Sequence, residues 1–157
     1  MSIKVGDQAP ELSLYNTDKI LVSLSEFKGQ NVLLLFFPLA FTGVCTDELC
    51  SVRDNLSLYQ KANAEVLGIS VDSPFTLERY KADQQLNFSL LSDFNKVVSE
   101  SYGVLYDVFP AFEMKGVSKR AAFIIDKDGI VQYEEICATP GHLPNFNEIQ
   151  KVLSNLN

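Results

Sequence analysis

The sequence is poor in the residue types that bind metal ions or cross-link small secreted domains. It has one histidine, His142, and three cysteines, Cys45, Cys50 and Cys137. The cysteines lack the paired spacing of a zinc site, and His142 follows Pro140-Gly141 in an expected loop. We therefore expect His142 to be a surface residue and no metal to be bound. A small, odd number of cysteines also excludes a disulfide-rich secreted scaffold and fits a reducing cytoplasm.

Basic residues are in deficit as well. The 13 lysines and arginines face 20 aspartates and glutamates, so the net charge is −7. Phosphate binding requires clustered basic residues, which excludes a nucleic-acid partner, and a polybasic membrane attachment is disfavoured for the same reason. The start of the chain has no signal-peptide pattern, and the longest apolar run near it, residues 32–37, has the length of a strand. We expect a cytoplasmic protein without membrane contact.

The apolar runs predict an α/β fold. No linker or repeat divides the chain, so we expect a single domain over residues 1–157. Continuous apolar runs at 32–37, 65–71 and 121–125 predict buried strands, and the turn sequence Asp126-Lys-Asp-Gly129 predicts a hairpin into 130–137. Leu12, Leu14 and residues 20–22 indicate an added N-terminal strand pair.

Helices are expected between these strands. Apolar residues three or four apart predict a helix from Thr46 to Tyr59, with Asp47 and Glu48 in its first turn. Pro74 can begin a second helix, and residues 97–102 and 147–156 predict two more. This alternation predicts a central mixed sheet flanked by helices, an arrangement compatible with a thioredoxin-like sandwich.

The most informative local feature is a cysteine between a strand and a helix. Cys45 follows Pro38 and a short loop and lies near the expected start of the helix. A helix N-terminus stabilises negative charge, and the thiolate, unlike the thiol, is a good nucleophile. Thr42 supplies a hydroxyl three residues earlier, and Gly43 allows close approach. A small buried cysteine is the alternative interpretation, but the position and the flanking residues favour a reactive one.

The segment Pro38-Leu-Ala-Phe-Thr-Gly-Val-Cys45 resembles the PxxxTxxC motif of peroxiredoxins, most closely the alkyl hydroperoxide reductase E branch. The resemblance runs from Val5-Gly6-Asp7-Gln8-Ala9-Pro10 to the terminal helix. It implies a thioredoxin-like fold with an N-terminal extension and a thiol-dependent peroxidase, an antioxidant enzyme of cell redox homeostasis. It implies no organic cofactor and no metal.

The resemblance also assigns roles. Cys45 would be the peroxidatic nucleophile, Thr42 would hydrogen-bond the peroxide, and Pro38 would shield the sulfur. Arg120 stands where the family places an arginine that enters from a distant strand, and Glu48 matches a glutamate that orients it. Simpler interpretations remain open: a solvated charge for Arg120, a helix-dipole residue for Glu48, and a helix cap for Thr42.

Cys50 lies five residues after Cys45, which is similar to the peroxiredoxin Q group (bacterioferritin comigratory proteins), where the second cysteine resolves the first. In an intact helix the two Cα atoms are about 8.6 Å apart. A disulfide requires roughly 4.4 to 6.8 Å, so the helix start must unwind first. Cys50 as a core residue, in a one-cysteine enzyme recycled by external thiol, is the alternative. Cys137 ends an apolar strand and is expected to be structural.

Other functions compete with this interpretation. A thioredoxin-type disulfide oxidoreductase would need CxxC, whereas the spacing here is CxxxxC. A non-enzymatic thioredoxin-fold interaction protein could use the aromatic segment 106–112, which is either a surface patch or core. The resemblance implies a peroxide substrate, a thioredoxin- or glutaredoxin-like reductant and a homodimer. The preferred peroxide stays open among hydrogen peroxide, organic hydroperoxides and peroxynitrite.

Overall fold

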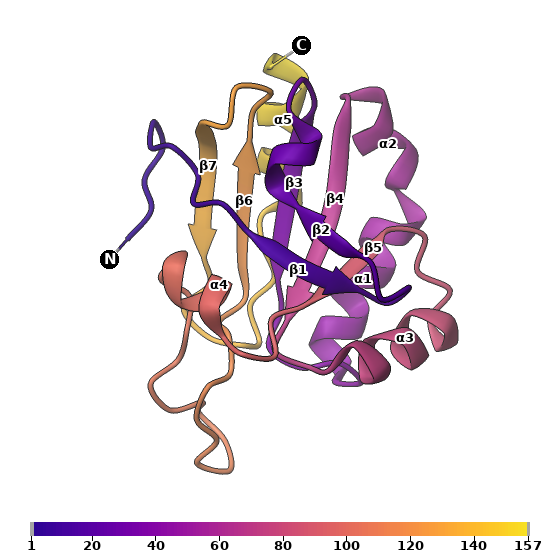
Figure 1. The fold of residues 1–157 in the computed structure, drawn as a ribbon, viewed down its shortest axis with the longest axis vertical. Helices are drawn as coiled ribbons and strands as arrows, with labels where there is room; N and C mark the ends of the chain where they lie inside the picture. The colour runs from indigo at the N-terminus through magenta and orange to yellow at the C-terminus, as the bar shows by residue number, and fades with distance from the viewer. Residues whose placement is uncertain (1, 157) are drawn as a thin grey trace.

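A computed structural model describes residues 2–156 of the chain. Seven strands form one mixed sheet in the order β2-β1-β5-β4-β3-β6-β7. The strands are β1 Ser13–Asn16, β2 Leu21–Ser23, β3 Asn31–Phe36, β4 Ala64–Ser70, β5 Ser89–Ser92, β6 Ala121–Ile125 and β7 Val131–Ile136. The helices are α1 Gly43–Asp54, α2 Leu56–Lys61, α3 Pro74–Asp83, α4 Val97–Ser101 and α5 Phe146–Asn155, with a 3-10 turn η1 at Leu24–Phe27 (Figure 1).

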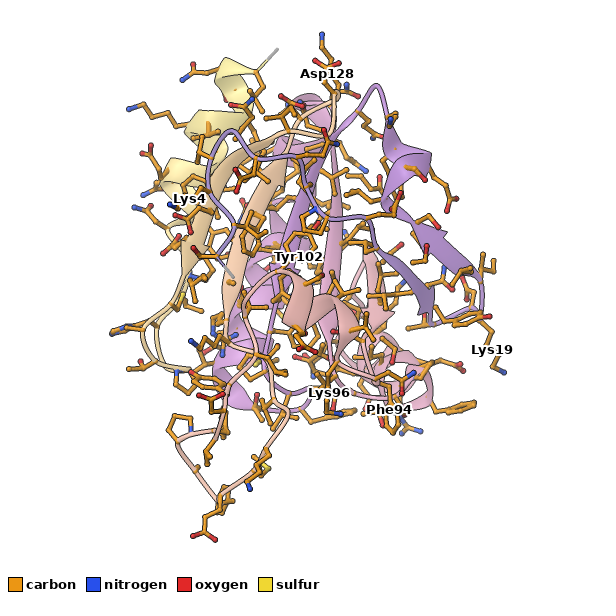
Figure 2. All side chains as sticks on the ribbon, turned by 60° about the vertical axis from the view of Figure 1, so that its left-hand side comes forward. Lys4, Lys19, Phe94, Lys96, Tyr102 and Asp128 are labelled. Atoms are coloured by element: carbon orange, nitrogen blue, oxygen red, sulfur yellow. The ribbon has the colours of Figure 1, made fainter. Side chains whose placement is uncertain are left out.

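Strands β3, β4 and β5 are parallel, and β6, β7 and β1 join this central part of the sheet in antiparallel fashion. Every residue of β3 is buried, because both faces of the sheet are covered. Leu33 and Leu35 face a core built with α1, α2, α3 and α5. Leu34 and Phe36 face a second core, which lies beneath α4 and the N-terminal segment. Tyr102 belongs to this second core (Figure 2).

The predicted mixed sheet flanked by helices is confirmed, and so is the added strand pair, which β1 and β2 form in antiparallel register. Strand β5 was not predicted. Its four residues, Ser89-Leu-Leu-Ser92, are too few to show a periodic pattern, and its pairing with both β4 and β1 makes it a strand. Within residues 2–156, no helix has both the length and the apolar character that crossing a membrane requires.

The predicted single helix from Thr46 to Tyr59 is wrong in two respects. Helix α1 already begins at Gly43, so the expected placement of Glu48 in the first turn is wrong as well. The helical stretch is also interrupted at Asn55, whose side-chain amide donates to the Ser51 carbonyl at 2.9 Å. Such bonds to a carbonyl four residues back compete with regular helix, which explains the break into α1 and α2.

The strand registers bring three distant segments to one edge of the sheet. Phe36 at the end of β3 is paired with Ala121 at the start of β6, and Ala121 is paired with Ile136 at the end of β7. The loop before α1, the residue before β6 and the loop after β7 therefore meet there. The segment between α4 and β6 projects beyond the same edge, at the bottom of Figure 1.

Candidate active site

Cys45 is the third residue of α1 and is 1% exposed. The first hydrogen bond of the helix runs from the Thr46 amide to the Thr42 carbonyl at 3.0 Å. The amides of Gly43, Val44 and Cys45 itself consequently lie at the open N-terminal end of the helix, where they favour an anion. The position predicted for Cys45 at a helix start is confirmed.

Arg120, the residue before β6, contacts the Cys45 sulfur. Its Nη2 donates a hydrogen bond to Cys45 Sγ at 3.3 Å, and the arginine is 1% exposed. A desolvated guanidinium at this distance stabilises negative charge on the sulfur. The alternative interpretation of Arg120 as a solvated strand-end charge is therefore wrong.

Glu48 completes the charged part of the site. Its Oε1 accepts from Arg120 Nη1 at 2.7 Å, and the glutamate is fully buried. Burial raises the pKa of Glu48 to about 7, although attraction to Arg120 opposes this shift. Glu48 Oε2 has no hydrogen-bond partner within residues 2–156, which adds to the cost of its charge. Glu48 thus contacts Arg120 as expected, and a role limited to the helix dipole is excluded by its burial.

The Pro140 carbonyl fixes the third side of the guanidinium. It accepts from Arg120 Nη2 at 2.8 Å and from Nε at 3.2 Å. Burial alone would lower the pKa of Arg120, but the charges of Glu48 and Cys45 and the hydrogen bonds to both outweigh it, so the pKa lies above its ordinary value. Arg120 stays protonated, and Cys45, Glu48 and the Pro140 carbonyl together fix the orientation of its guanidinium.

Cys45 opens into a cavity of about 250 Å³. Thr42 lies on its wall, and its hydroxyl donates to the Leu39 carbonyl at 2.7 Å, which leaves the oxygen able to accept another hydrogen bond. Thr42 is the N-cap residue of α1 by its backbone, but its side chain makes no capping bond. The buried Pro38 also lines the cavity. The remaining lining residues are Leu39, Val44, Cys45, Phe109, Phe112, Met114, Arg120, Pro140 and Gly141.

The loop that leads to Cys45 is supported by residues that were not predicted from the sequence. Asp72 Oδ2 accepts from the Ala40 amide at 2.8 Å and from the Ser70 hydroxyl at 2.7 Å. Ser118 donates to the Phe37 carbonyl at 3.1 Å. Asp72 follows the carboxyl end of β4, which is a parallel neighbour of β3. This position in the sequence could have predicted that Asp72 lies near the loop after β3.

The other two cysteines lie apart from the cavity, and all three are free thiols. Cys50 is half-buried on α1, and its thiol contacts Gln84 Oε1 at 3.6 Å. Cys137 follows β7 and is buried; burial, and then the charges of Glu135 and Glu48, raise its pKa to about 11. Such a thiol is unreactive near neutral pH, as expected for a structural residue.

His142 is exposed, as predicted. Within residues 2–156 no group of three or more histidine, cysteine, aspartate or glutamate side chains is arranged to hold a metal ion. The aromatic segment 106–112 lies in the projecting loop, with Val108 49% and Phe112 88% exposed. That segment is therefore largely a surface, which decides between the two interpretations left open.

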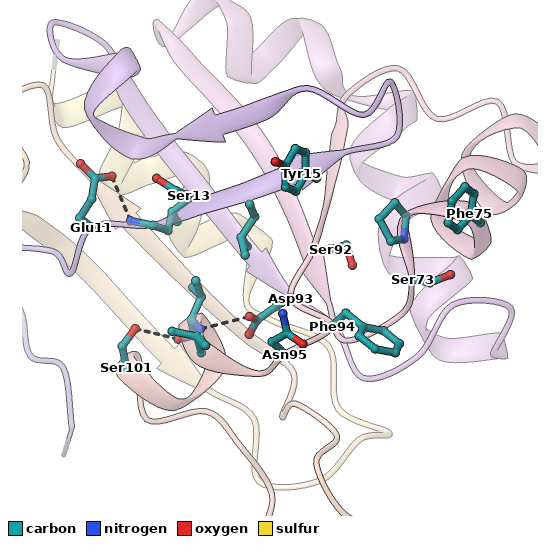
Figure 3. Close-up of a pocket in the computed structure, with 15 residues that line it drawn as sticks. Glu11, Ser13, Tyr15, Ser73, Phe75, Ser92, Asp93, Phe94, Asn95 and Ser101 are labelled. Carbon is teal, nitrogen blue, oxygen red and sulfur yellow. Dashed lines mark hydrogen bonds between the residues drawn. The ribbon is translucent and has the colours of Figure 1, made fainter.

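A larger cavity lies elsewhere, between β1, the start of α3 and α4, with a volume of about 760 Å³. Figure 3 shows Tyr15, Phe75 and Phe94 around it. Lys96 Nζ lies 5.4 Å from the centre of the Phe94 ring at its rim (Figure 2). Neither Cys45 nor Arg120 lines this cavity, so its size does not identify it as the reactive site.

Known proteins resemble this chain in both sequence and structure. Peroxiredoxin Bcp of Escherichia coli is 42% identical over 132 residues, which cover 83% of this chain and 84% of the relative. Alkyl hydroperoxide reductase E of Mycobacterium tuberculosis is 38% identical over 137 residues, covering 85% and 86%. The crystal structure of a peroxiredoxin-like protein from Aquifex aeolicus superimposes with a TM-score of 0.89 at 29% identity, covering 100% of this chain and 90% of that one.

These similarities confirm the resemblance to alkyl hydroperoxide reductase E and the resemblance to the bacterioferritin comigratory proteins. They also confirm the thioredoxin-like fold. They define the enzyme class as peroxiredoxin, a thiol-dependent peroxidase, rather than a disulfide oxidoreductase or an interaction protein. The AhpC/TSA family model matches residues 5–134, and the chain belongs to this family.

Proposed function

We propose that Cys45 is the peroxidatic cysteine and that Arg120, Thr42 and Pro38 form its site. The observation that carries this proposal is the 3.3 Å hydrogen bond from Arg120 to the sulfur of a cysteine that opens into a cavity. The thiolate attacks the terminal peroxide oxygen. As the S–O bond forms and the O–O bond breaks, the second oxygen leaves with the electron pair, takes a proton and departs as water or an alcohol.

Arg120 acts on the charge that moves during this step. In the ground state it faces a thiolate, and in the transition state negative charge develops on the leaving oxygen. The fixed guanidinium can stabilise both charges without reorientation, because Glu48 and the Pro140 carbonyl hold it. Thr42 accepts the hydrogen of the peroxide O–H, and Pro38 excludes water from the sulfur. Hydrogen peroxide and organic hydroperoxides share the O–O–H unit, so this site accommodates both.

Cys50 then resolves the Cys45 sulfenic acid. Both residues lie in α1, where their Cα atoms are about 8.6 Å apart by helix geometry, so the first turns must unwind before an S–S bond forms. A thioredoxin- or glutaredoxin-like protein reduces the disulfide by thiol exchange. This cycle needs no metal or organic cofactor and suits a reducing cytoplasm.

The protein is also proposed to form a homodimer. Phe41, Val108 and Phe112 are 52%, 49% and 88% exposed, and Phe112 lines the cavity itself. Phe41 and Val108 adjoin in sequence the cavity-lining residues Thr42 and Phe109, and exposed apolar groups around one cavity are typical of an interaction surface. A second copy placed here would cover these side chains and help to close the cavity to water.

One experiment tests the proposed cycle. Wild type, Cys45→Ser and Cys50→Ser are each mixed with one equivalent of hydrogen peroxide, quenched with an alkylating agent and analysed by peptide mass spectrometry. We expect the wild type to lose two hydrogens in a peptide containing Cys45 and Cys50, and Cys50→Ser to accumulate sulfenic acid on Cys45. Persistent sulfenic acid in the wild type would instead identify a one-cysteine enzyme recycled by external thiol. Peroxide consumption by Cys45→Ser would contradict the assignment of the nucleophile.

A further inference from the structure

Cys50 lies in a set of contacts that the peroxide-reducing step does not use. Its thiol points to the end of α3, where Gln84 Oε1 lies 3.6 Å from the sulfur. The main-chain carbonyl of the same Gln84 accepts from Arg53 Nη1 at 2.6 Å. Gln84 therefore binds two residues of α1 with two different oxygens. Its side-chain oxygen binds Cys50, and its main-chain oxygen binds Arg53 near the end of the helix.

The position of Gln84 is fixed by the way in which α3 ends. Gln85 has a left-handed backbone with φ of 53°, the Gln85 amide bonds to the Ala82 carbonyl at 3.2 Å, and the Leu86 amide bonds to the Lys81 carbonyl at 3.0 Å. This pair of bonds is a Schellman motif, which closes a helix firmly at its carboxyl end. A cation at such an end is favourable, because carbonyl groups point outward there. Arg53 and Gln84 thus form a stable contact between α1 and α3.

Arg53 also lies close to the second thiol. Cys50 and Arg53 are three residues apart on one helix, so their side chains are neighbours on its surface. The pKa of Arg53 is raised, mainly by its hydrogen bond to Asp54, and the attraction of Cys50 contributes in the same direction. Asn87 Nδ2 donates to the Arg53 carbonyl at 3.2 Å and adds a second link from the chain beyond α3.

Other contacts must break when the helix start unwinds. The Thr46 hydroxyl is 2.9 Å from the Tyr80 hydroxyl, and this bond belongs to the turn that must open. The contact of Cys50 with Gln84 must also break, because the sulfur has to move toward Cys45. The Arg53 contact lies beyond the segment between the two cysteines and can persist. The guanidinium then remains beside the segment that carries the attacking thiol.

Resting on the proposed role of Cys50, we propose that Gln84 and Arg53 control the resolving step with opposite effects. Gln84 retains the Cys50 thiol in the folded helix by accepting its S–H, which opposes departure. Arg53 stabilises the Cys50 thiolate as it attacks. The Cys50 sulfur bonds to the sulfenic sulfur of Cys45, the S–O bond breaks, and hydroxide leaves and combines with the proton released by Cys50 to give water. Both are positioning residues and take no part in peroxide reduction.

The two steps can be timed separately by rapid quench, alkylation and mass spectrometry. The variants are Gln84→Leu, which removes the acceptor, Arg53→Met, which removes the charge, and Arg53→Lys as the conservative control. In all three we expect Cys45 sulfenic acid to form at the wild-type rate. Disulfide formation should be about threefold faster in Gln84→Leu, the size of a weak neutral hydrogen bond. It should be about tenfold slower in Arg53→Met, which lacks the charge that stabilises the attacking sulfur, and largely restored in Arg53→Lys.

The opposite signs separate this proposal from a structural role. Two variants that merely loosened the contact between α1 and α3 would change the resolving rate in the same direction, and that result overturns the proposal. Unchanged resolving rates in Gln84→Leu and Arg53→Met, with normal disulfide formation in wild type, also overturn it while leaving the proposed cycle intact. Failure of the cycle looks different: wild type would then form sulfenic acid at Cys45 without any disulfide, or no sulfenic acid at all.

Discussion

The guanidinium of Arg120 contacts the sulfur of Cys45 at 3.3 Å although 75 residues separate them in the sequence. The contact follows from the antiparallel pairing of β3 with β6, in which Phe36 is the partner of Ala121. The residue before β6 therefore lies beside the loop that follows β3. A buried guanidinium can be kept at this position because Glu48 and the Pro140 carbonyl bind its other nitrogen atoms.

Replacing Arg120 should slow peroxide reduction severely while retaining the fold. In Arg120→Met, loss of a fixed donor to the developing charge should reduce the rate of sulfenic acid formation by about 10²-fold or more. Arg120→Lys should also be slow, because an ammonium cannot contact Cys45, Glu48 and Pro140 in one plane. The rate is measured at pH 6, where Glu48, with a pKa of about 7, can take up a proton and avoid an unpaired buried charge. A near-wild-type rate in Arg120→Met with unchanged circular dichroism would contradict the role of Arg120.

Glu48 should make stability depend on pH. Its pKa is about 7 in the folded protein against an ordinary value of 4.5, so the folded state keeps a proton that the unfolded state releases between these values. The contribution is fully present below pH 4.5 and is lost as pH rises to about 7, by on the order of 3 kcal/mol. Urea unfolding of wild type and Glu48→Gln across this range measures it. The difference in the free energy of unfolding between wild type and Glu48→Gln should change between pH 4.5 and about 7. Curves of stability against pH that run parallel for the two proteins would exclude the effect.

Asp72 should matter for the cysteine loop without touching the sulfur. Asp72→Ala removes the one carboxylate oxygen that accepts from both the Ala40 amide and the Ser70 hydroxyl, so both bonds are lost. We expect a loss of about 1 to 2 kcal/mol in the free energy of unfolding and a several-fold slower peroxide step. Ser73→Ala serves as a nearby control, since the Ser73 side chain caps α3 by accepting from the Thr76 amide. Equal kinetic effects of both variants would show that Asp72 acts only through general stability.

The proposed dimer should depend on the exposed aromatic loop. Phe112→Glu places a charge where the side chain is 88% exposed, so the monomer should stay as stable as wild type. At micromolar concentration, sedimentation velocity should show a dimer for wild type and a monomer for this variant. Leu58→Glu, on α2, is the matched control, because Leu58 is 46% exposed and lies outside the cavity of Cys45. A wild-type protein that sediments as a monomer would reject the proposal.

Cys137 should be the least reactive thiol. Burial, reinforced by the charges of Glu135 and Glu48, raises its pKa to about 11, so at pH 8 only about one molecule in 10³ carries its thiolate. Alkylation of the native protein with iodoacetamide at pH 8, followed by peptide mass spectrometry, should label the half-buried Cys50 well before Cys137. Urea should make the two equal. Preferential labelling of Cys137 under native conditions would contradict this assignment.

Local sequence determined much of this protein. The apolar runs gave β3, β4 and β6 almost to the residue, because a strand buried on both faces needs continuous hydrophobic side chains. The segment from Pro38 to Cys45 was sufficient to predict a cysteine at a helix start, because a loop and a following helix N-terminus are built from neighbouring residues. The prediction that Cys50 is the resolving thiol came from its spacing from Cys45.

Tertiary structure decided what depends on distant contacts. Short strand β5 exists because β1 and β4 pair with it, and the meeting of Arg120, Glu48 and the Pro140 carbonyl follows from the strand registers at one edge of the sheet. The raised pKa of Glu48 is a consequence of burial, which a sequence pattern does not quantify. The contacts of Gln84 with Cys50 and Arg53 likewise require α1 and α3 to lie side by side. The sequence thus placed Cys45 at the start of a helix, whereas its charge environment and its neighbours were set by packing.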